Sequence, residues 1–382
     1  MKKGKRVLVA MSGGVDSSTA AALLLEQGFE VIGLTMCFNI GSGSSRRPSC
    51  CGIEGIEDAR RVAGVLGIRH YVLNFSRILE EKVISNFINE YLIGRTPNPC
   101  IRCNQYLKFG ALLKKAQELD CDYLATGHHA RITRCKMPAL SADRPACRSG
   151  RQDTRCKYLL KKGRDKTKDQ SYFLHCIRKH NLPKILFPVG EYTKQQVRSL
   201  ASTFGLPVAE KPGSQEICFI TNTDYHGFLK DRLPRMKKNI KPGLIKDLEG
   251  RILGEHKGIA FYTLGQREGL GISAASRLYV IRIDAKYNTI YVGKEEDTYS
   301  RSLIAKEPNF LIGRLSKRSL EVNAKIRYNH PQAKARVEFL CAQRLRVDFE
   351  EPQKAITPGQ SVVFYDKDIV IGGAIIDKVL SK

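Results

Sequence analysis

Residues 6–18 read RVLVAMSGGVDSS, and this stretch decides the fold. The apolar run Arg6–Met11 predicts a buried β-strand, and Ser17–Gln27 predicts the helix that follows it. Gly13 and Gly14 lack the Cβ atoms that would keep an anion away from the turn between them. Backbone N–H groups and the helix N-terminus would then converge on one anion, so the turn predicts a phosphate site.

Strands and helices continue to alternate as far as about residue 130. This alternation predicts an α/β fold with a doubly wound parallel sheet, in which ligands lie at the carboxyl ends of the strands. Ser12–Ser18 and Gly127–His129 both follow such strand ends. The further strands we predict are Glu30–Phe38, His70–Phe75 and Asp122–Thr126, and the helices are Glu57–Leu66, Leu79–Leu92 and Phe109–Leu119.

The pattern changes beyond about residue 220 to short strands between glycine-rich turns, which predicts a small β domain and then a β-barrel. We therefore predict a nucleotide-binding catalytic domain over 1–215, a central domain over 216–294 and a barrel over 295–382. Cys135–Lys157 is basic and without periodicity, and we expect an exposed loop or hairpin tip there. The predicted strands are Gly258–Leu264, Leu278–Asp284, Thr289–Val292, Ala335–Phe339, Leu345–Phe349 and Ser361–Tyr365.

The chain of 382 residues carries a net charge of +26, from 64 Lys and Arg against 38 Asp and Glu. The excess includes Arg46-Arg47, Arg131–Lys168, Arg232–Lys241 and Arg314–Arg318. Such a surface suits a polyanion such as RNA, although solvated surface lysines would give the same composition. No apolar run is long enough to span a membrane or to form a signal-peptide core, so we expect a cytoplasmic protein without a membrane partner.

The nucleotide loop lacks the lysine of a Walker A loop, and its pattern SGGVDS resembles the PP-loop of ATP pyrophosphatases. That resemblance implies cleavage of ATP between the α- and β-phosphates, with adenylation of a carbonyl oxygen that leaves later as AMP. Ser12, Ser17 and Ser18 would add hydroxyl donors to the phosphates, and Asp16 would hold Mg²⁺ against them.

A second motif, RTPNPCIRCN at 95–104, holds Cys100 and Cys103. Pro97 and Pro99 disfavour helix before each ring and predict a preset loop. Arg95 and Arg102 would favour the reactive thiolate form. A third cysteine, Cys218, lies in SQEICFI. A CxxC pair alone fits a redox pair, a zinc knuckle or an iron–sulfur ligand set.

Several further motifs occur in order along nearly the whole chain: LKFG, LATGHHAR, KDQSYFL, LFPVGEYTKQQVR, YTLGQREGLGI, IRYNH and TPGQSVVFY. Together with MSGGVDSS, GRTPNPCIRCN and SQEICFI, they resemble the tRNA-specific 2-thiouridylases. The resemblance implies a PP-loop domain, a small central β domain and a C-terminal β-barrel. It also implies ATP, Mg²⁺, the anticodon stem-loop of tRNA and a persulfide donor protein such as a cysteine desulfurase or a relay protein.

The resemblance also assigns residues. Cys103 matches the family's nucleophile and Cys218 its persulfide carrier. The positions that match ATP-binding residues are Ala10, Met11, Ser12, Gly13, Gly14, Val15, Asp16, Ser17, Met36 and Gly127. The positions that match tRNA-contacting residues are Asn98, Pro99, Cys100, His128, Lys168, Asp169, Gln170, Arg327, Tyr328 and Gln360. Arg327 and Lys168 suit phosphates, Tyr328 suits a base, and Asn98 and Gln360 suit base edges or riboses.

The reaction implied by the resemblance starts with adenylation of O2 of the wobble uridine, position 34, which is splayed out of the anticodon loop. The persulfide on Cys218 then delivers sulfur to C2, directly or as released sulfide. Cys103 resolves the persulfide, a Cys103–Cys218 disulfide forms as AMP leaves, and a reductant resets the pair.

The chain departs from the family at Cys100, where many relatives have an acidic residue, and at the added pair Cys50-Cys51. Cys100, Cys103 and Cys218 could instead hold a [4Fe–4S] cluster with one open iron for hydrosulfide, without a disulfide cycle. Cys50-Cys51 could be a sulfur relay or spare thiols in a loop. We assign no role to Cys135, Cys147 and Cys156, and we expect Cys37, Cys121, Cys176 and Cys341 in the core.

Two other functions account for part of the sequence. A PP-loop ligase or amidotransferase acting on a small molecule would explain the nucleotide loop but not the cysteines, the charge or the barrel. A non-catalytic RNA-binding protein would explain the charge but predicts that ATP is not consumed.

Overall fold

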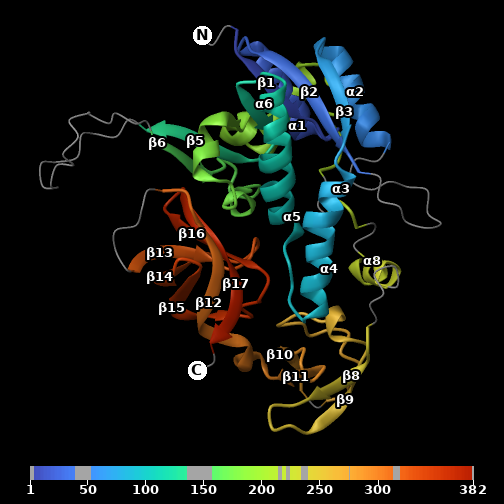
Figure 1. Ribbon diagram of the computed structural model, residues 1–382, viewed down its shortest axis with the longest axis vertical. Coiled ribbons are helices and arrows are strands. Elements are labelled where there is room, and N and C mark those ends of the chain that lie inside the picture. Colours follow the sequence, from blue (N-terminus) through green and yellow to red (C-terminus); the bar gives the residue numbers. More distant parts are fainter. Residues whose placement is uncertain are drawn as a thin grey trace, which may run out of the picture.

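The computed structural model describes residues 4–38, 53–135, 157–213, 217–220, 224–233, 240–274, 276–312 and 319–380. An α/β part lies at the top of Figure 1, a β-barrel lies below it, and a small β part lies at the bottom. Two helical columns, one of α5 and α6 and one of α3 and α4, run downward from the α/β part. Within the described residues, every helix is too short or too polar to cross a membrane.

The α/β part is built on a five-stranded sheet in the order β3-β2-β1-β4-β7, and all its strand pairs are parallel. The order reverses at β1, so the turn that follows β1 opens at the switch point of the sheet, where such folds bind ligands. The predicted doubly wound sheet is therefore confirmed. Its strands are β1 (Arg6–Ala10), β2 (Glu30–Cys37), β3 (Arg69–Asn74), β4 (Tyr123–Thr126) and β7 (Ile185–Leu186).

Three helices flank this sheet: α1 (Val15–Glu26), α2 (Ile53–Leu66) and α7 (Lys194–Thr203). Apolar residues of α1 and α7 share one buried cluster with the sheet strands, because both helices present small or branched apolar side chains to it. The predicted helices at 17–27 and 57–66 are confirmed, each with an earlier start than predicted.

The helical columns contain π-helical turns. α3 (Ser76–Leu79) continues through a π-helical segment, Glu80–Ile84, into α4 (Ser85–Leu92). The second column starts with α5 (Pro99–Arg102), continues through the π-helical segment η2 (Cys103–Leu112) and ends with α6 (Leu113–Glu118). The predicted helix at 109–119 is thus only the second half of a helix that begins at residue 99.

The small β part contains a four-stranded sheet in the order β10-β11-β8-β9. The strand predicted at Gly258–Leu264 is wrong: Ile259–Phe261 forms a 3₁₀ turn after Gly258, whose φ of 125° no β-strand has. The strands are β8 (Gly243–Lys246), β9 (Ile252–His256), β10 (Tyr279–Asp284) and β11 (Thr289–Gly293), and a helix, α8 (Tyr225–Arg232), precedes them.

Six antiparallel strands form the C-terminal barrel, which closes through pairing of β12 with β17. Closure leaves no free edge, and the inward side chains form a separate apolar core. The predicted barrel is confirmed. Its strands are β12 (Tyr299–Phe310), β13 (Ser319–Lys325), β14 (Ala333–Cys341), β15 (Arg344–Lys354), β16 (Ser361–Asp366) and β17 (Ile369–Leu380).

A hairpin of the α/β part reaches this barrel. β5 (Ala130–Cys135) and β6 (Lys157–Lys162) pair antiparallel from Ala130↔Lys162 to Cys135↔Lys157, and β6 touches β17 at Lys161↔Ile369. Residues 136–156, between these strands and within the predicted loop or hairpin tip, lie outside the described residues.

Some predictions lie outside the described residues: Cys50-Cys51, Cys147, Cys156, Arg46-Arg47, Arg314–Arg318 and the domain boundary at 215/216. The domain limits stay predictions.

Candidate active site

The turn after β1 is shaped by its own hydroxyl groups. Gly13 has a φ of 71°, a conformation that favours glycine. Ser12 N donates to Ser17 Oγ at 3.1 Å, and Ser17 Oγ donates to the Gly14 carbonyl at 3.1 Å. Ser18 Oγ donates to the same carbonyl at 3.0 Å. Ser17 and Ser18 thus hold the loop in shape, and the role of these hydroxyls as phosphate donors stays a prediction.

Gly127 and Gly33 let neighbouring elements approach this loop. A Cβ on Gly127 would lie 2.5 Å from Ser17 N and 2.6 Å from the Asp16 carbonyl carbon, so the end of β4 rests directly on the first turn of α1. A Cβ on Gly33 would lie 2.6 Å from Sδ of the buried Met11. The predicted positions Ala10, Val15 and Met36 lie at the end of β1, at the start of α1 and near the end of β2.

Asp16 holds two partners that the sequence did not reveal. Lys194 Nζ lies 2.6 Å from Asp16 Oδ1, and His129 Nε2 lies 3.2 Å from the same oxygen. Burial alone would raise the pKa of Asp16, but the hydrogen bonds from His129 and Lys194 outweigh it and lower that pKa. Asp16 is therefore an ionised, hard oxygen ligand, which fits the predicted Mg²⁺. Lys194 lies in the motif LFPVGEYTKQQVR, but its contact with Asp16 could not be predicted because 178 positions separate the two residues.

His128 connects the end of β4 to the helix that carries the thiols. Its Nδ1 lies 2.7 Å from Thr126 Oγ1, and its Nε2 lies 3.3 Å from Lys108 Nζ. Burial, followed by the nearby Lys108 charge, lowers the pKa of His128 well below its usual value. The ring is therefore neutral: Lys108 donates to Nε2, and Nδ1–H donates to Thr126. His128 is a predicted tRNA contact, and it is buried here.

Cys100 and Cys103 lie on a helix, so the predicted loop is wrong. Asn98 is the N-cap of α5, its Oδ1 accepts from Ile101 N at 3.4 Å, and Pro99 occupies the first helical turn. Proline is favoured there because that position needs no N–H partner, and asparagine is a preferred cap. The Asn98-Pro99 pair was thus a helix-start signal that the sequence offered.

Cys100, Cys103 and Cys218 form one cluster. Burial raises the pKa of Cys100 to about 11 and that of Cys103 to about 12. Cys218 raises both pKa values further, and the Lys108 ammonium lowers both. A charged group shifts the pKa of another group in this way when the two groups lie close together. The three predicted thiols and Lys108 are therefore near enough to influence the pKa values of Cys100 and Cys103.

Arg95 and Arg102, which we predicted to favour the thiolates, are both engaged in ion pairs. Arg95 forms ion pairs with Glu90 at 2.6 Å and Asp377 at 3.0 Å, and Arg102 pairs with Glu307 at 3.0 Å. Their charges are used to join elements, and neither lowers the pKa of Cys100 or Cys103. The cation that lowers both pKa values is Lys108.

The other described cysteines differ in burial. Cys121 and Cys176 are buried, as predicted, whereas Cys37 and Cys135 are half-buried and Cys341 is exposed at the end of β14. The prediction failed for Cys341 because it closes a strand at the barrel rim, where the apolar pattern continues past the core. Across the described residues, no group of three or more His, Cys, Asp or Glu side chains is arranged to hold a metal ion.

The predicted tRNA contacts at 168–170 lie in one loop beside the nucleotide site. Lys168 is exposed, as are Arg164 and Lys166. Asp169 accepts from Gly163 N, Ser171 N and Ser171 Oγ, so it shapes the loop. Gln170 and His129 exchange two hydrogen bonds of 2.9 Å through the backbone of His129.

The predicted tRNA contacts of the barrel are also engaged within the chain. Arg327 donates to Thr357 Oγ1 at 2.7 Å and to the Ala355 carbonyl. The ring of Tyr328 lies 4.5 Å from that of Phe173. Gln360 Nε2 donates to the Thr96 carbonyl at 2.9 Å, next to the α5 helix start. Gln360 thereby brings the barrel to the thiol helix.

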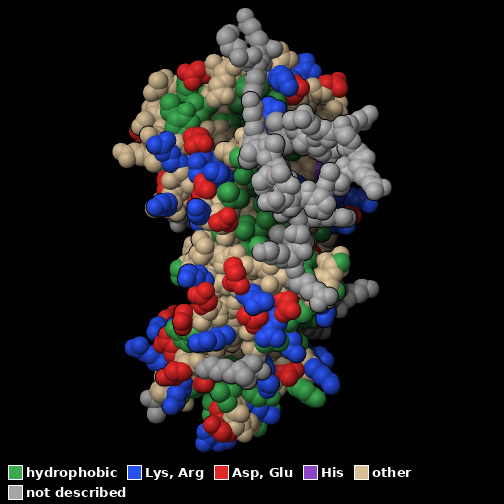
Figure 2. Space-filling view, turned by 90° about the vertical axis from the view of Figure 1, so that its left-hand side faces the viewer, with side chains coloured by type: hydrophobic (Ala, Val, Ile, Leu, Met, Phe, Trp, Pro, Cys, Tyr) green, Lys and Arg blue, Asp and Glu red, His purple; other side chains and the backbone are tan. Residues whose placement is uncertain are grey.

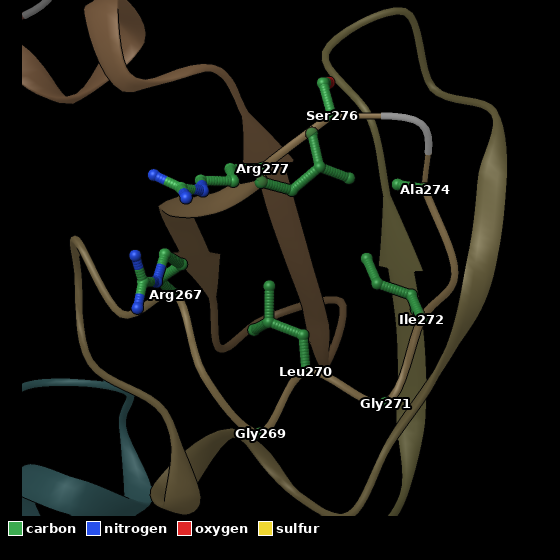
Figure 3. A pocket seen from close by; sticks show the side chains of 9 residues that line it. Arg267, Gly269, Leu270, Gly271, Ile272, Ala274, Ser276 and Arg277 are labelled. Atoms are coloured by element: carbon green, nitrogen blue, oxygen red, sulfur yellow. The ribbon is translucent and has the colours of Figure 1, made fainter.

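A separate pocket lies in the small β part and contains none of the predicted site residues (Figure 3). Arg267 and Arg277 border it, and Leu270 and Ile272 contribute apolar side chains. On the face shown in Figure 2, basic and acidic side chains are mixed over the lower half of the molecule, so the net charge forms no single basic patch on the part of that face that is described.

Comparison with known families finds matches for three regions of the chain. Residues 5–222 match a family described as the tRNA methyl transferase HUP domain, residues 226–294 match its PRC-barrel domain, and residues 300–376 match an aminomethyltransferase β-barrel domain. Fold and site together define a multidomain tRNA-modifying enzyme with a nucleotide loop and a thiol centre.

Full-length relatives identify the family within that class. The chain is 47% identical to tRNA-specific 2-thiouridylase MnmA 1 of Caldanaerobacter subterraneus subsp. tengcongensis, over 99% of both chains. It is 48% identical to MnmA of Pelotomaculum thermopropionicum, over 99% of this chain and 98% of the relative. The chain therefore belongs to the tRNA-specific 2-thiouridylases, which are sulfurtransferases. The regional descriptions mention methyl transfer, but identity over the full length and the thiol cluster both favour thiolation.

Proposed function

We propose that this chain uses ATP to replace O2 of uridine 34 in tRNA by sulfur, in the cytoplasm, through Cys218 and Cys103. One observation carries the proposal: Lys108 contacts His128 at the nucleotide strand and also acts on the pKa values of Cys100 and Cys103. Gly127, next to His128, rests on the nucleotide loop. Nucleotide loop and thiols are thus connected through adjacent residues.

The loop after β1 and the N-terminus of α1 bind the phosphates of ATP. Asp16 would hold Mg²⁺, which screens the phosphate charge. O2 of the uridine attacks the α-phosphate, pyrophosphate leaves, and O2 becomes part of an AMP leaving group.

Sulfur arrives on Cys218 as a persulfide from a donor protein. Its terminal sulfur attacks C2, AMP leaves with O2, and a C2–S–S–Cys218 adduct remains. The Cys103 thiolate then attacks Sγ of Cys218, so the C2-bound sulfur is released as the thiocarbonyl and a Cys103–Cys218 disulfide forms. A reductant returns two thiols.

The buried thiols are protonated in this state, since their pKa values are raised to about 11 and about 12. This protects them from oxidation until substrate arrives. Lys108 is the group that would stabilise the thiolate of Cys103 when a base or the adduct takes its proton.

The test uses Cys218→Ser with tRNA, ATP and a persulfide donor. We expect no 2-thiouridine by mass spectrometry of digested tRNA, with tRNA affinity unchanged. The matched control is Cys341→Ser, which alters an exposed thiol at the barrel rim and should thiolate normally. Normal thiolation by Cys218→Ser would refute the assigned role. An anaerobic absorption spectrum with iron and sulfide analysis distinguishes this route from a [4Fe–4S] cluster on the same cysteines.

A further inference from the structure

The nucleotide loop lacks a cation of its own for the phosphates. Cleavage between the α- and β-phosphates develops charge on departing pyrophosphate, and enzymes stabilise such charge with fixed cations and dipoles. The sequence MSGGVDSS contains no Lys or Arg. A positive side chain at this loop must therefore come from another element.

Lys194 is the positive side chain that the fold places there. Its Nζ lies 2.6 Å from Asp16 Oδ1 at the first turn of α1, and its side chain is only 17% exposed. No sequence neighbour of the loop is involved, because Lys194 is the first residue of α7.

Three sets of contacts fix the position of Lys194. Thr193 and Gln196 form a capping box at the start of α7. The backbone N–H of Lys194 donates to Asp165 Oδ2 at 2.9 Å. Helix α7 packs on α1, where Thr19 Oγ1 donates to the Val197 carbonyl at 3.4 Å. An exposed ion pair forms without such contacts, so the fold holds Lys194 in place more firmly than an ion pair alone requires.

His129 shows that the polar network at Asp16 is incomplete without a ligand. Its side chain is 4% exposed and its Nε2 contacts Asp16. Its Nδ1 is buried and finds no hydrogen-bond partner in the described part of the chain. Buried polar atoms are normally satisfied, so an orphan at this position points to a bound polar group.

We infer that Lys194 is the phosphate-binding cation of this enzyme, and that it rests on Asp16 only while no nucleotide is bound. If Asp16 held Mg²⁺, the shielded ammonium would lose its counter-ion, and leaving it unpaired would be costly. The β- and γ-phosphates of ATP, bound at the same loop, would then be its partners. Lys194 then stabilises the leaving pyrophosphate. This inference rests on the proposed ATP cleavage.

The test measures AMP and pyrophosphate formation in the presence of tRNA, which precedes and does not need sulfur transfer. For Lys194→Met we expect kcat/KM for ATP to fall by about a hundredfold or more. We also expect weaker binding of α,β-methylene-ATP by calorimetry and unchanged tRNA affinity. Lys194→Arg keeps the charge and should recover to within about tenfold of the wild type.

The matched control is Lys211→Met. Lys211 pairs with Asp58 of α2, another largely buried aspartate of the same domain, and not with Asp16. The Lys211→Met variant should be less stable than the wild type but have the same kcat/KM for ATP. The inference is overturned if Lys194→Met cleaves ATP like the wild type, or if Lys194→Arg is as defective as Lys194→Met in a folded protein. If the wild type itself forms no AMP and pyrophosphate with tRNA, the proposed function fails instead.

Discussion

Gly127 shows how one missing side chain keeps the nucleotide site assembled. A Cβ there would lie 2.5 Å from Ser17 N, a contact that only a backbone shift can relieve. We expect Gly127→Ala to weaken ATP binding about tenfold or more and to cost about 1–3 kcal/mol of stability through overpacking. Calorimetry and urea unfolding measure both effects.

Gly64 provides the control for that substitution. It lies inside α2, and a Cβ there would meet nothing within 4 Å. Gly64→Ala should therefore raise the free energy of unfolding by about 0.5–1 kcal/mol and leave ATP binding unchanged. If both alanine variants bind ATP normally, close packing at Gly127 has no role in the site.

The raised pKa of Cys103 predicts that its alkylation rate depends on pH. Only the thiolate reacts with iodoacetamide, and burial raises the pKa of Cys103 to about 12. Its alkylation rate should therefore rise about tenfold per pH unit from pH 7 to pH 10, since the thiolate fraction does so below the pKa. Peptide mass spectrometry gives the rate, and exposed Cys341 reports whether the reagent is active. A rate that levels off near pH 8 would contradict the raised pKa.

At the scale of elements, Arg95 joins α4 to the last barrel strand. It is 13% exposed and contacts Glu90 of α4, Asp377 of β17 and the Ile376 carbonyl. Removing one member of a buried ion network leaves the others unpaired, so Arg95→Met should cost about 3 kcal/mol. Arg77→Met, which breaks the exposed pair with Glu81, should cost under about 1 kcal/mol. If both variants lost the same free energy of unfolding in urea, Arg95 would stabilise the contact between α4 and β17 no more than an exposed ion pair does.

Elements with their own local signal could be predicted from the sequence. The apolar strand Arg6–Ala10 and the glycine turn after it could be predicted from their own residues, without knowledge of their contacts to other elements. Pro97 and Pro99 favour a loop when they are taken as helix breakers, but Asn98 and Pro99 also have the cap and first-turn preferences of a helix start, and α5 begins there. The strand predicted at 258–264 failed because apolar residues also fill a buried 3₁₀ turn.

The site is only partly local, which limits what sequence alone could predict. The three thiols were predicted from their motifs. Lys108 and Lys194 also lie in motifs of the chain, but their contacts could not be predicted, since a lysine carries no spacing signal of its own. Their partners His128 and Asp16 lie 20 and 178 positions away. Tertiary packing alone brings these charges to the loop and the cysteines.

At the scale of the whole molecule, the predicted tRNA footprint extends from the exposed loop with Lys168 to the barrel. Because phosphate contacts release counterions, Lys168→Ala should weaken tRNA binding and reduce the slope of log K against log salt by about 1. Lys286→Ala, at the exposed turn after β10 of the small β part, is the control and should leave the slope unchanged. Filter binding over a salt series measures it, and an unaltered slope for Lys168→Ala would remove that residue from the footprint.

The thiol cycle can be tested in one turnover. Persulfide-loaded protein is mixed with ATP and tRNA without reductant, and 2-thiouridine and cysteine peptides are quantified together by mass spectrometry. We predict one Cys103–Cys218 disulfide for each 2-thiouridine formed. Formation of 2-thiouridine with Cys103 and Cys218 both still reduced would contradict the account.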